Sequence, residues 1–175
     1  EIVRDGLRVV IIGAPNAGKS SLLNALAGRD VAIATDVAGT TRDLIDIRLD
    51  LRGHLAIFTD TAGIRENAGA VEAIGIERAL ERAAWADVVL LLVDLSNPIW
   101  VDIDTTAPVV LKVGSKVDLL GSIPDGFDHA ISTRTGEGLN RLLDAIGSVA
   151  MNMANAGNVL VVQQRQKALI GACVG

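Results

Sequence analysis

The sequence predicts an α/β domain of three layers, in which helices cover both faces of a mostly parallel sheet that carries one antiparallel edge hairpin. Half of the 175 residues are apolar while only 2% are aromatic. Aliphatic side chains must therefore pack the core, as is typical of a parallel sheet buried on both faces. Apolar runs of strand length alternate with stretches of helical periodicity, and the first run leads directly into a glycine-rich loop.

That loop, Gly13 to Ser20, reads G-x-x-x-x-G-K-S and follows the apolar run Val9–Ile12. Glycines let successive backbone N–H groups surround an anion, and the helix that follows directs its positive end to the same place. Lys19 adds a charge, and the Ser20 hydroxyl is able to bind magnesium. The sequence therefore predicts a phosphate-binding loop. The alternative is a glycine-rich turn that only joins a strand to a helix.

The first strand is expected at Arg8–Ile12 and the first helix at Ser20–Ala27. Ile45–Arg52 then alternates apolar and charged residues, which predicts a half-exposed strand. Gly53 and His54 are expected to turn the chain into a second strand at Leu55–Thr59, which completes a hairpin.

An amphipathic helix is expected over Val71–Ala86. The continuous apolar runs Val88–Val93 and Val109–Val113 predict central parallel strands. Between these strands, Ser96–Pro108 contains prolines and β-branched residues, so any crossover helix there is short or distorted. Ala130–Ile131 is expected to form a brief strand.

Near the end of the chain, Leu139–Ala154 has the apolar spacing of a helix, and Gly157 is expected to end that packing unit. Gln163–Cys173 has the pattern of a further helix. We therefore expect a nucleotide-binding domain over residues 1–156 and the start of a truncated helical segment over 157–175.

Composition excludes several classes of function. The net charge of −5 argues against a broad nucleic-acid surface on this domain, although a partner could supply one. Cys173 is the single cysteine, so neither an intrachain disulfide nor a cysteine zinc site is expected. No apolar run approaches the roughly 18 residues that span a bilayer. These features predict a cytoplasmic protein.

Further motifs follow the phosphate loop in order. Gly39–Asp43 offers a threonine for magnesium and the γ-phosphate, and Asp60–Gly63 reads D-x-x-G, whose carboxylate holds magnesium through water. Ser115–Asp118 lies where guanine-binding proteins carry N-K-x-D, and Ser132–Arg134 lies where they carry S-A-[KR]. The Asp118 carboxylate is able to accept two hydrogen bonds from the guanine N1–H and 2-amino groups, a pattern that adenine lacks.

Each short motif is weak alone, but their order and spacing together indicate a guanine-nucleotide-binding protein. The alternative for Asp60 and Asp118 is a role as turn caps.

The chain resembles the G domain of the tRNA-modification GTPase MnmE (TrmE) family, a P-loop NTPase of the Ras-like type. The segments that carry the resemblance are Gly13–Ser21, Ala38–Asp43, Asp60–Glu66 and Val71–Arg78. It covers about Arg8 to Ala150 and implies GTP or GDP, Mg²⁺ and K⁺ as cofactors.

The resemblance also implies individual roles. Asn16 would bind potassium with Thr35, Val37 and Thr40, in the place where other GTPases use an arginine finger. Magnesium would be bound by Ser20, Thr41 and Asp60. Glu72 would orient the attacking water. The catalytic residues would be Lys19, Thr41 and Glu72.

The expected nucleotide-binding set includes the residues of the phosphate loop, the switch segment and the base loops. Its members are Asn16, Ala17, Gly18, Lys19, Ser20, Ser21, Thr35, Asp36, Val37, Ala38, Gly39, Thr40, Thr41, Asp60, Thr61, Ala62, Gly63, Ser115, Lys116, Asp118, Ser132, Thr133 and Arg134.

The resemblance implies a G domain that dimerises in its triphosphate state. The full-length protein would work with an MnmG-type partner to modify the tRNA wobble uridine. The chain departs from the family at Ser115 and Thr133, which replace asparagine and alanine. In the family the asparagine ties this loop to the phosphate loop; because serine is shorter, weaker nucleotide binding is expected. The alternatives are a ribosome-assembly GTPase, the G domain of an iron transporter, or a regulatory nucleotide-binding module with little hydrolysis of its own.

Overall fold

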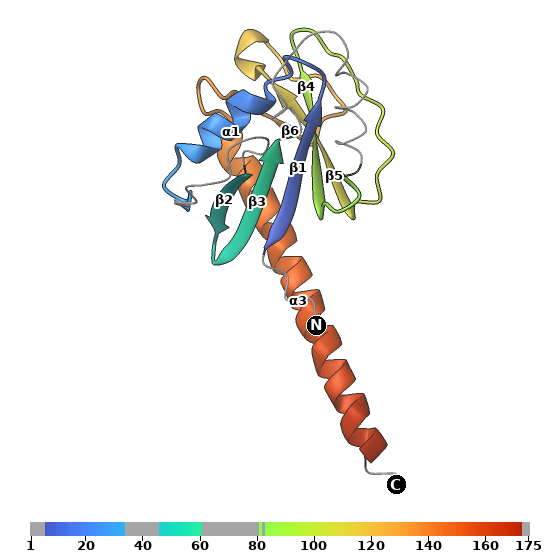
Figure 1. The fold of residues 1–175 in the computed structure, drawn as a ribbon. Helices are drawn as coiled ribbons and strands as arrows, with labels where there is room; N and C mark the ends of the chain where they lie inside the picture. The colour runs from blue at the N-terminus through green and yellow to red at the C-terminus, as the bar shows by residue number, and fades with distance from the viewer. Residues whose placement is uncertain (1–5, 34–45, 61–80, 82, 173–175) are drawn as a thin grey trace.

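The computed structural model describes residues 6–33, 46–60, 81 and 83–172. The described strands are β1 (Leu7–Gly13), β2 (Asp46–Leu51), β3 (His54–Asp60), β4 (Val88–Asp94), β5 (Val109–Ser115) and β6 (His129–Ala130). They form one sheet in the order β2-β3-β1-β4-β5-β6 (Figure 1). Every neighbouring pair is parallel except β2 and β3. The structure thus confirms a mostly parallel sheet with one antiparallel edge hairpin.

One face of the sheet is covered by two helices, α1 (Lys19–Ala27) and α3 (Leu139–Ala172). Leu22 and Leu26 of α1 and Leu142 and Ile146 of α3 are fully buried in one core cluster with Phe58 of β3. Their spacing along each helix places the apolar positions on one side, which is the side that packs on the sheet.

The opposite face has a smaller core that includes Val10, Ile12, Val89 and Leu91. The irregular chain between β4 and β5 packs against it through side chains such as Val101. No helix forms in residues 95–108, which confirms that the proline-bearing crossover is not a regular helix. The expected helix over 71–86 lies almost entirely outside the described residues.

The hairpin turn differs from the prediction by one residue. Arg52 and Gly53 form the turn with φ values of 58° and 85°, and His54 already belongs to β3. Two successive positive φ values are typical of a type I′ turn, whose twist matches that of paired strands. The prediction that Gly53 and His54 form the turn was therefore wrong, because the glycine occupies the second turn position and not the first.

The C-terminal helix is also longer than predicted. α3 continues through Gly157 and joins the two helical stretches that the apolar pattern separates (Figure 1). A glycine inside a helix costs only about 1 kcal/mol relative to alanine, and no proline follows it. No described helix is long and apolar enough to cross a membrane.

Candidate nucleotide-binding site

The phosphate loop lies between the end of β1 and the start of α1. A Cβ atom at Gly13 would lie 2.4 Å from the carbonyl oxygen of Leu92, so glycine is required for this close approach of β1 to β4. Asn16 has φ 64° and Gly18 has φ 100°. Such left-handed values are typical of loops whose N–H groups form an anion-binding nest.

Lys19 supplies the charge of this loop. Its side chain lies back over the loop, and its ammonium group donates hydrogen bonds of 2.8 Å to the carbonyl oxygens of Gly13 and Ala14. Lys19 is 8% exposed, and a buried ammonium group requires such partners. Ser20 and Ser21 follow on the exposed side of the first turn. The loop therefore presents a positive charge and a hydroxyl group at a helix N-terminus, where a phosphate binds favourably.

The segment Ser115–Asp118, the base loop, is linked directly to the phosphate loop through Ser115. This residue ends β5 and is 3% exposed. Its hydroxyl donates a hydrogen bond of 2.6 Å to the carbonyl oxygen of Ala17. Although serine is shorter than the usual asparagine, it makes a contact between the two loops.

Lys116 makes the second connection between the loops. Its ammonium group donates to the carbonyl oxygen of Asn16 at 3.2 Å and pairs with the carboxylate of Asp94. Burial by itself would raise the pKa of Asp94, but hydrogen bonds from Lys116 and Ser96 outweigh it and hold this pKa below its ordinary value. The carboxylate is therefore ionised at neutral pH.

Asp118 lies in a short 3₁₀ helix, Val117–Leu119, and its side chain is 14% exposed. Arg134 lies across from it, with a guanidinium nitrogen 4.0 Å from a carboxylate oxygen of Asp118. The Val117 N–H donates to the carbonyl oxygen of Ile131 at 3.1 Å. This bond places the segment Ser132–Arg134 beside Asp118, as expected of the two base-binding motifs.

Ser132 is completely buried, and its hydroxyl accepts a hydrogen bond of 3.1 Å from the Thr135 N–H. It therefore shapes the loop before α3, while Thr133 is half-buried and Arg134 is exposed. A Cβ atom at Gly138 would lie 2.0 Å from the carbonyl oxygen of Ala130, so this loop packs tightly against β6.

The described residues thus bring together the phosphate-loop and base-loop members of the predicted site. Asp60 ends β3 beside Ile11 of β1, at the same edge of the sheet where the other motifs lie. The remaining predicted residues lie outside the described part of the chain: Thr35, Asp36, Val37, Ala38, Gly39, Thr40, Thr41, Thr61, Ala62, Gly63 and Glu72.

Some of the predicted metal-binding residues lie in the described part of the chain and others lie outside it. Ser20 and Asn16 are exposed at the phosphate loop, and a hydroxyl and an amide oxygen are donors that suit magnesium and potassium. Within the described ranges no group of three or more His, Cys, Asp or Glu residues could hold a metal ion.

Sequence reasoning missed Asp94 and Ser96 at this site. Asp94 ends the buried run Val88–Val93, just as Asp60 ends β3. A carboxylate at the C-terminal end of a parallel strand, next to other motifs of that kind, was the available signal.

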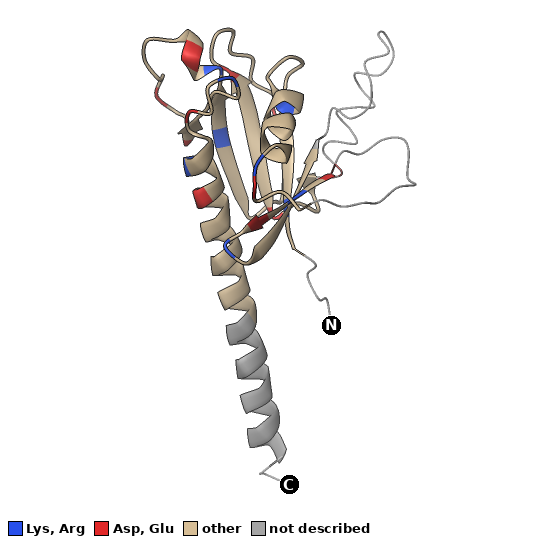
Figure 2. Cartoon of the chain, turned by 90° about the vertical axis from the view of Figure 1, so that its left-hand side faces the viewer, with Lys and Arg blue, Asp and Glu red and all other residues tan. Residues whose placement is uncertain are grey.

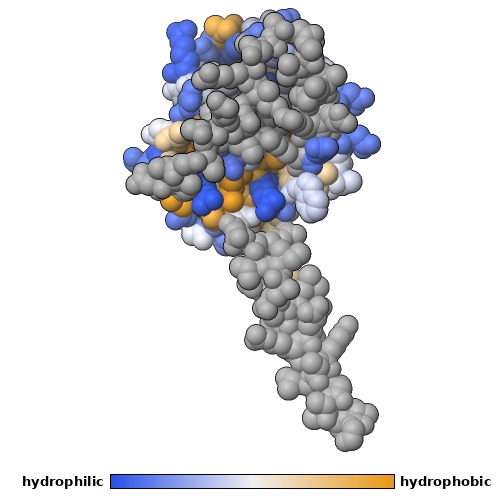
Figure 3. All heavy atoms as spheres, in the orientation of Figure 1, coloured by the Kyte–Doolittle hydropathy of each residue, from blue (hydrophilic) through white to orange (hydrophobic). Residues whose placement is uncertain are grey.

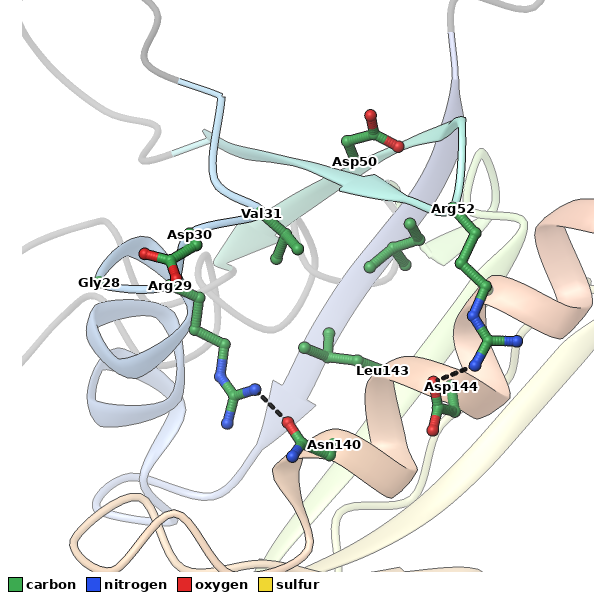
Figure 4. A pocket seen from close by; sticks show the side chains of 11 residues that line it. Gly28, Arg29, Asp30, Val31, Asp50, Arg52, Asn140, Leu143 and Asp144 are labelled. Carbon is green, nitrogen blue, oxygen red and sulfur yellow. Dashed lines mark hydrogen bonds and ion pairs between the residues drawn. The ribbon is translucent and has the colours of Figure 1, made fainter.

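A cavity of about 630 Å³ lies away from these loops, between the end of α1, the β2–β3 hairpin and α3 (Figure 4). Arg29 donates a hydrogen bond to Asn140, and Arg52 forms an ion pair of 2.9 Å with Asp144. These contacts connect α3 to the hairpin and to the chain after α1. Neither the phosphate loop nor the Ser115–Asp118 loop lines this cavity, so it lies apart from the predicted nucleotide site.

A family model described as "50S ribosome-binding GTPase" matches residues 8–119. The chain belongs to this family of GTPases. The domain therefore binds a guanine nucleotide.

This GTPase is 51% identical over 173 residues to the "tRNA modification GTPase MnmE" of Chelativorans sp. (strain BNC1), covering 98% of the chain and 39% of that relative. The protein of the same name from Brucella anthropi is 55% identical over 149 residues, covering 85% and 34%. These relatives confirm the resemblance to the MnmE family. The chain spans less than two fifths of their length.

Solved structures agree on the fold. A variant of Era from Aquifex aeolicus, bound to GDP.AlF4-, has a TM-score of 0.59 and 27% identity, with coverage of 82% of the GTPase and 56% of Era. The G domain of the T. maritima FeoB iron transporter has a TM-score of 0.58 at 24% identity and covers 82% and 98%. The Ras-like G-domain fold is thus confirmed.

Proposed function

We propose that this GTPase domain selects guanine through Asp118 and hydrolyses Mg·GTP with the help of potassium, as part of a protein that modifies the tRNA wobble uridine. The observation that carries the proposal is the junction of the two loops. Ser115 binds the Ala17 carbonyl oxygen at 2.6 Å, and Lys116 binds that of Asn16 at 3.2 Å. Such a junction fixes the distance from the base site to the phosphate site, which one nucleotide must span.

The carboxylate of Asp118 is the group that would distinguish bases. It accepts hydrogen bonds but donates none, so it suits the N1–H and 2-amino donors of guanine. Adenine offers no matching pair, and a buried acceptor left without a donor is costly. Arg134 lies 4.0 Å from this carboxylate and balances its charge.

The catalytic groups follow the phosphate loop. Lys19 would bind the β- and γ-phosphates, and Glu72 would orient the attacking water. Magnesium would be held by Ser20, Thr41 and Asp60. The potassium ligands would be Asn16, Thr35, Val37 and Thr40. The two cations would offset negative charge that develops as the γ-phosphate leaves.

At the level of the whole protein, the proposal rests on the relatives that are named tRNA modification GTPase MnmE. We place the protein in the cytoplasm, with G domains that pair in the triphosphate state. An MnmG-type partner and tRNA would bind through the full-length protein. The negative net charge of −5 fits a tRNA surface that lies outside this domain.

The test is a titration of the domain with fluorescent GDP and ADP. GDP is expected to bind at least about 100-fold more tightly, because ADP leaves the Asp118 acceptor unpaired. Equal affinities would contradict the assignment of Asp118. Ribose 5′-diphosphate, which is what remains of either nucleotide without its base, serves as the control for phosphate binding alone.

A ribosome-assembly GTPase is the second candidate, favoured by the description of the family model and by the similarity to Era. The identities separate the two candidates: 51–55% for the MnmE relatives against 27% for Era. Binding of the full-length protein to tRNA and to the large ribosomal subunit, measured side by side, would decide between them.

A further inference from the structure

Asp94 occupies a fixed position between the two loops. One carboxylate oxygen accepts hydrogen bonds from the Ser96 N–H at 2.8 Å and from its hydroxyl at 2.6 Å. The other oxygen binds the ammonium group of Lys116. The side chain of Asp94 is 14% exposed. Both oxygens are thus engaged, and the carboxylate has one well-defined orientation.

The backbone that carries Asp94 is itself anchored to β5. The Leu95 N–H donates to the carbonyl oxygen of Ser115 at 3.1 Å. The Leu95 side chain packs over Gly114 so closely that a Cβ atom there would lie 2.6 Å from Leu95 Cδ2. These contacts fix the backbone next to Asp94 relative to the base loop.

The ammonium group that Asp94 holds reaches the phosphate loop. Lys116 donates to the Asn16 carbonyl oxygen at 3.2 Å. Lys116 and Asn16 have φ values of 60° and 64°, a left-handed state that such residues keep only where surrounding contacts favour it. The Asp94–Lys116–Asn16 chain joins both of these strained positions.

We propose that Asp94 is a positioning residue for guanine-nucleotide binding, which holds Lys116 against the phosphate loop and so keeps the base and phosphate sites in register. The inference rests on the proposed function of the same site. Asp94 would act through Lys116 and not touch the nucleotide.

Charge is central to this role. Replacing Asp94 by asparagine keeps the size of the side chain and its acceptor for Ser96 but removes the negative charge that Lys116 pairs with. Charge-assisted hydrogen bonds are roughly twice as strong as neutral ones. Lys116 would then lose its fixed geometry, and the Asn16 carbonyl would lose a donor.

The experiment is a double-mutant cycle on the affinity for fluorescent GDP, using Asp94→Asn, Lys116→Ala and the double variant. Asp94→Asn is expected to weaken binding about tenfold. In the Lys116→Ala background the same change is expected to alter affinity by less than about twofold, since its target is already gone. Equal losses in both backgrounds would mean that Asp94 acts through the fold, and would overturn the proposal.

The matched control is Asp87→Asn. In the wild-type protein the Asp87 carboxylate, just before β4, accepts a hydrogen bond of 2.9 Å from the Arg8 N–H. This substitution is expected to leave GDP affinity unchanged. Ser96→Ala is the second variant in case Asp94→Asn does not fold, with an expected loss of about threefold. Unchanged affinity in Ser96→Ala, when Asp94→Asn cannot be measured, would also overturn the proposal.

Failure of the inference is distinguishable from failure of the proposed function. If wild-type protein does not prefer GDP to ADP, the function assigned to Asp118 is wrong. If that preference holds in wild type and in Asp94→Asn while the affinity of the latter is unchanged, the guanine site stands and the positioning role of Asp94 is wrong.

Discussion

Ser115 stands where guanine-binding loops usually carry asparagine, and its hydroxyl donates to the Ala17 carbonyl oxygen at 2.6 Å. The link between the loops is thus retained by a smaller side chain. Ser115 is only 3% exposed. Loss of its hydrogen bond would leave a buried polar group without a partner and lower the stability of the fold. Weaker nucleotide binding through this substitution stays a prediction.

At Asp118, exchanging the carboxylate for an amide should change which base is preferred. Asp118→Asn offers one donor and one acceptor in place of two acceptors, so xanthine should be preferred to guanine. We expect GDP affinity to fall by about 100-fold, equivalent to a few kcal/mol for the mismatched pair. Competition of GDP and XDP for the same fluorescent nucleotide measures this. Unchanged preference would return Asp118 to the role of a turn cap.

Glu72 and Asn16 should carry separable parts of hydrolysis. Glu72→Ala is expected to lower single-turnover GTP hydrolysis about 10² to 10⁴-fold with nucleotide affinity retained, because orienting water does not hold phosphate. Asn16→Ala should instead abolish the difference between potassium and sodium buffers. Glu81→Ala, at an exposed glutamate before β4, is the control. A normal rate in Glu72→Ala would leave that glutamate as a solvated surface charge.

At the scale of elements, replacing Gly157 and Gly13 by alanine should change the free energy of unfolding in opposite directions. Gly157→Ala in α3 should raise the free energy of unfolding by about 0.5–1 kcal/mol, since nothing lies within 4 Å of the added Cβ atom. Gly13→Ala should lower it by about 3 kcal/mol through the collision with Leu92. Urea denaturation without nucleotide measures both. Destabilisation by Gly157→Ala would contradict a continuous α3.

The elements were predictable wherever the pattern was long. Val88–Val93 is a continuous apolar run and Leu139–Ala154 has apolar residues at helical spacing, and both elements are present. The hairpin turn was misplaced by one residue because a single glycine fits either position of a two-residue turn. The helix end predicted at Gly157 was wrong, because the low helix propensity of one glycine does not end a helix that has helix-forming residues on both sides.

The sequence motifs predict members of the candidate site but not the contacts that join them. Lys19, Lys116 and Asp118 follow from spacing along the chain. The contact from Lys116 to Asn16 joins residues far apart in sequence, and Asp94 belongs to no motif. Such contacts depend on the register of β4 and β5, which no local pattern specifies.

At the scale of the molecule, potassium should control both rate and assembly. Wild-type protein is expected to hydrolyse GTP on the order of 100-fold faster in potassium than in sodium, because sodium is smaller and holds its water more tightly. Pairing of G domains with a transition-state analogue should follow the same preference. Single-turnover kinetics and sedimentation in matched salts measure these effects. Identical behaviour in the two salts would discard the potassium mechanism.

The described surface mixes charged, other hydrophilic and hydrophobic residues. Basic and acidic residues are interspersed along the described chain, without a continuous basic face in the view of Figure 2. Hydrophobic residues appear in separate areas among hydrophilic ones (Figure 3). Trp100, which is 50% exposed, stacks on Phe127 with ring centroids 5.2 Å apart.

The length of α3 amplifies small changes in its orientation relative to the sheet. With 34 residues, its axis is about 51 Å long at 1.5 Å per residue. The hydrogen bond from Arg29 to Asn140 and the ion pair of Arg52 with Asp144 both involve the first two turns of this helix. A tilt of about 5° at that base would carry the far end through about 4 Å, by the geometry of a rigid helix of this length. Sub-ångström shifts near the cavity would therefore become movements of atomic size at the distal end.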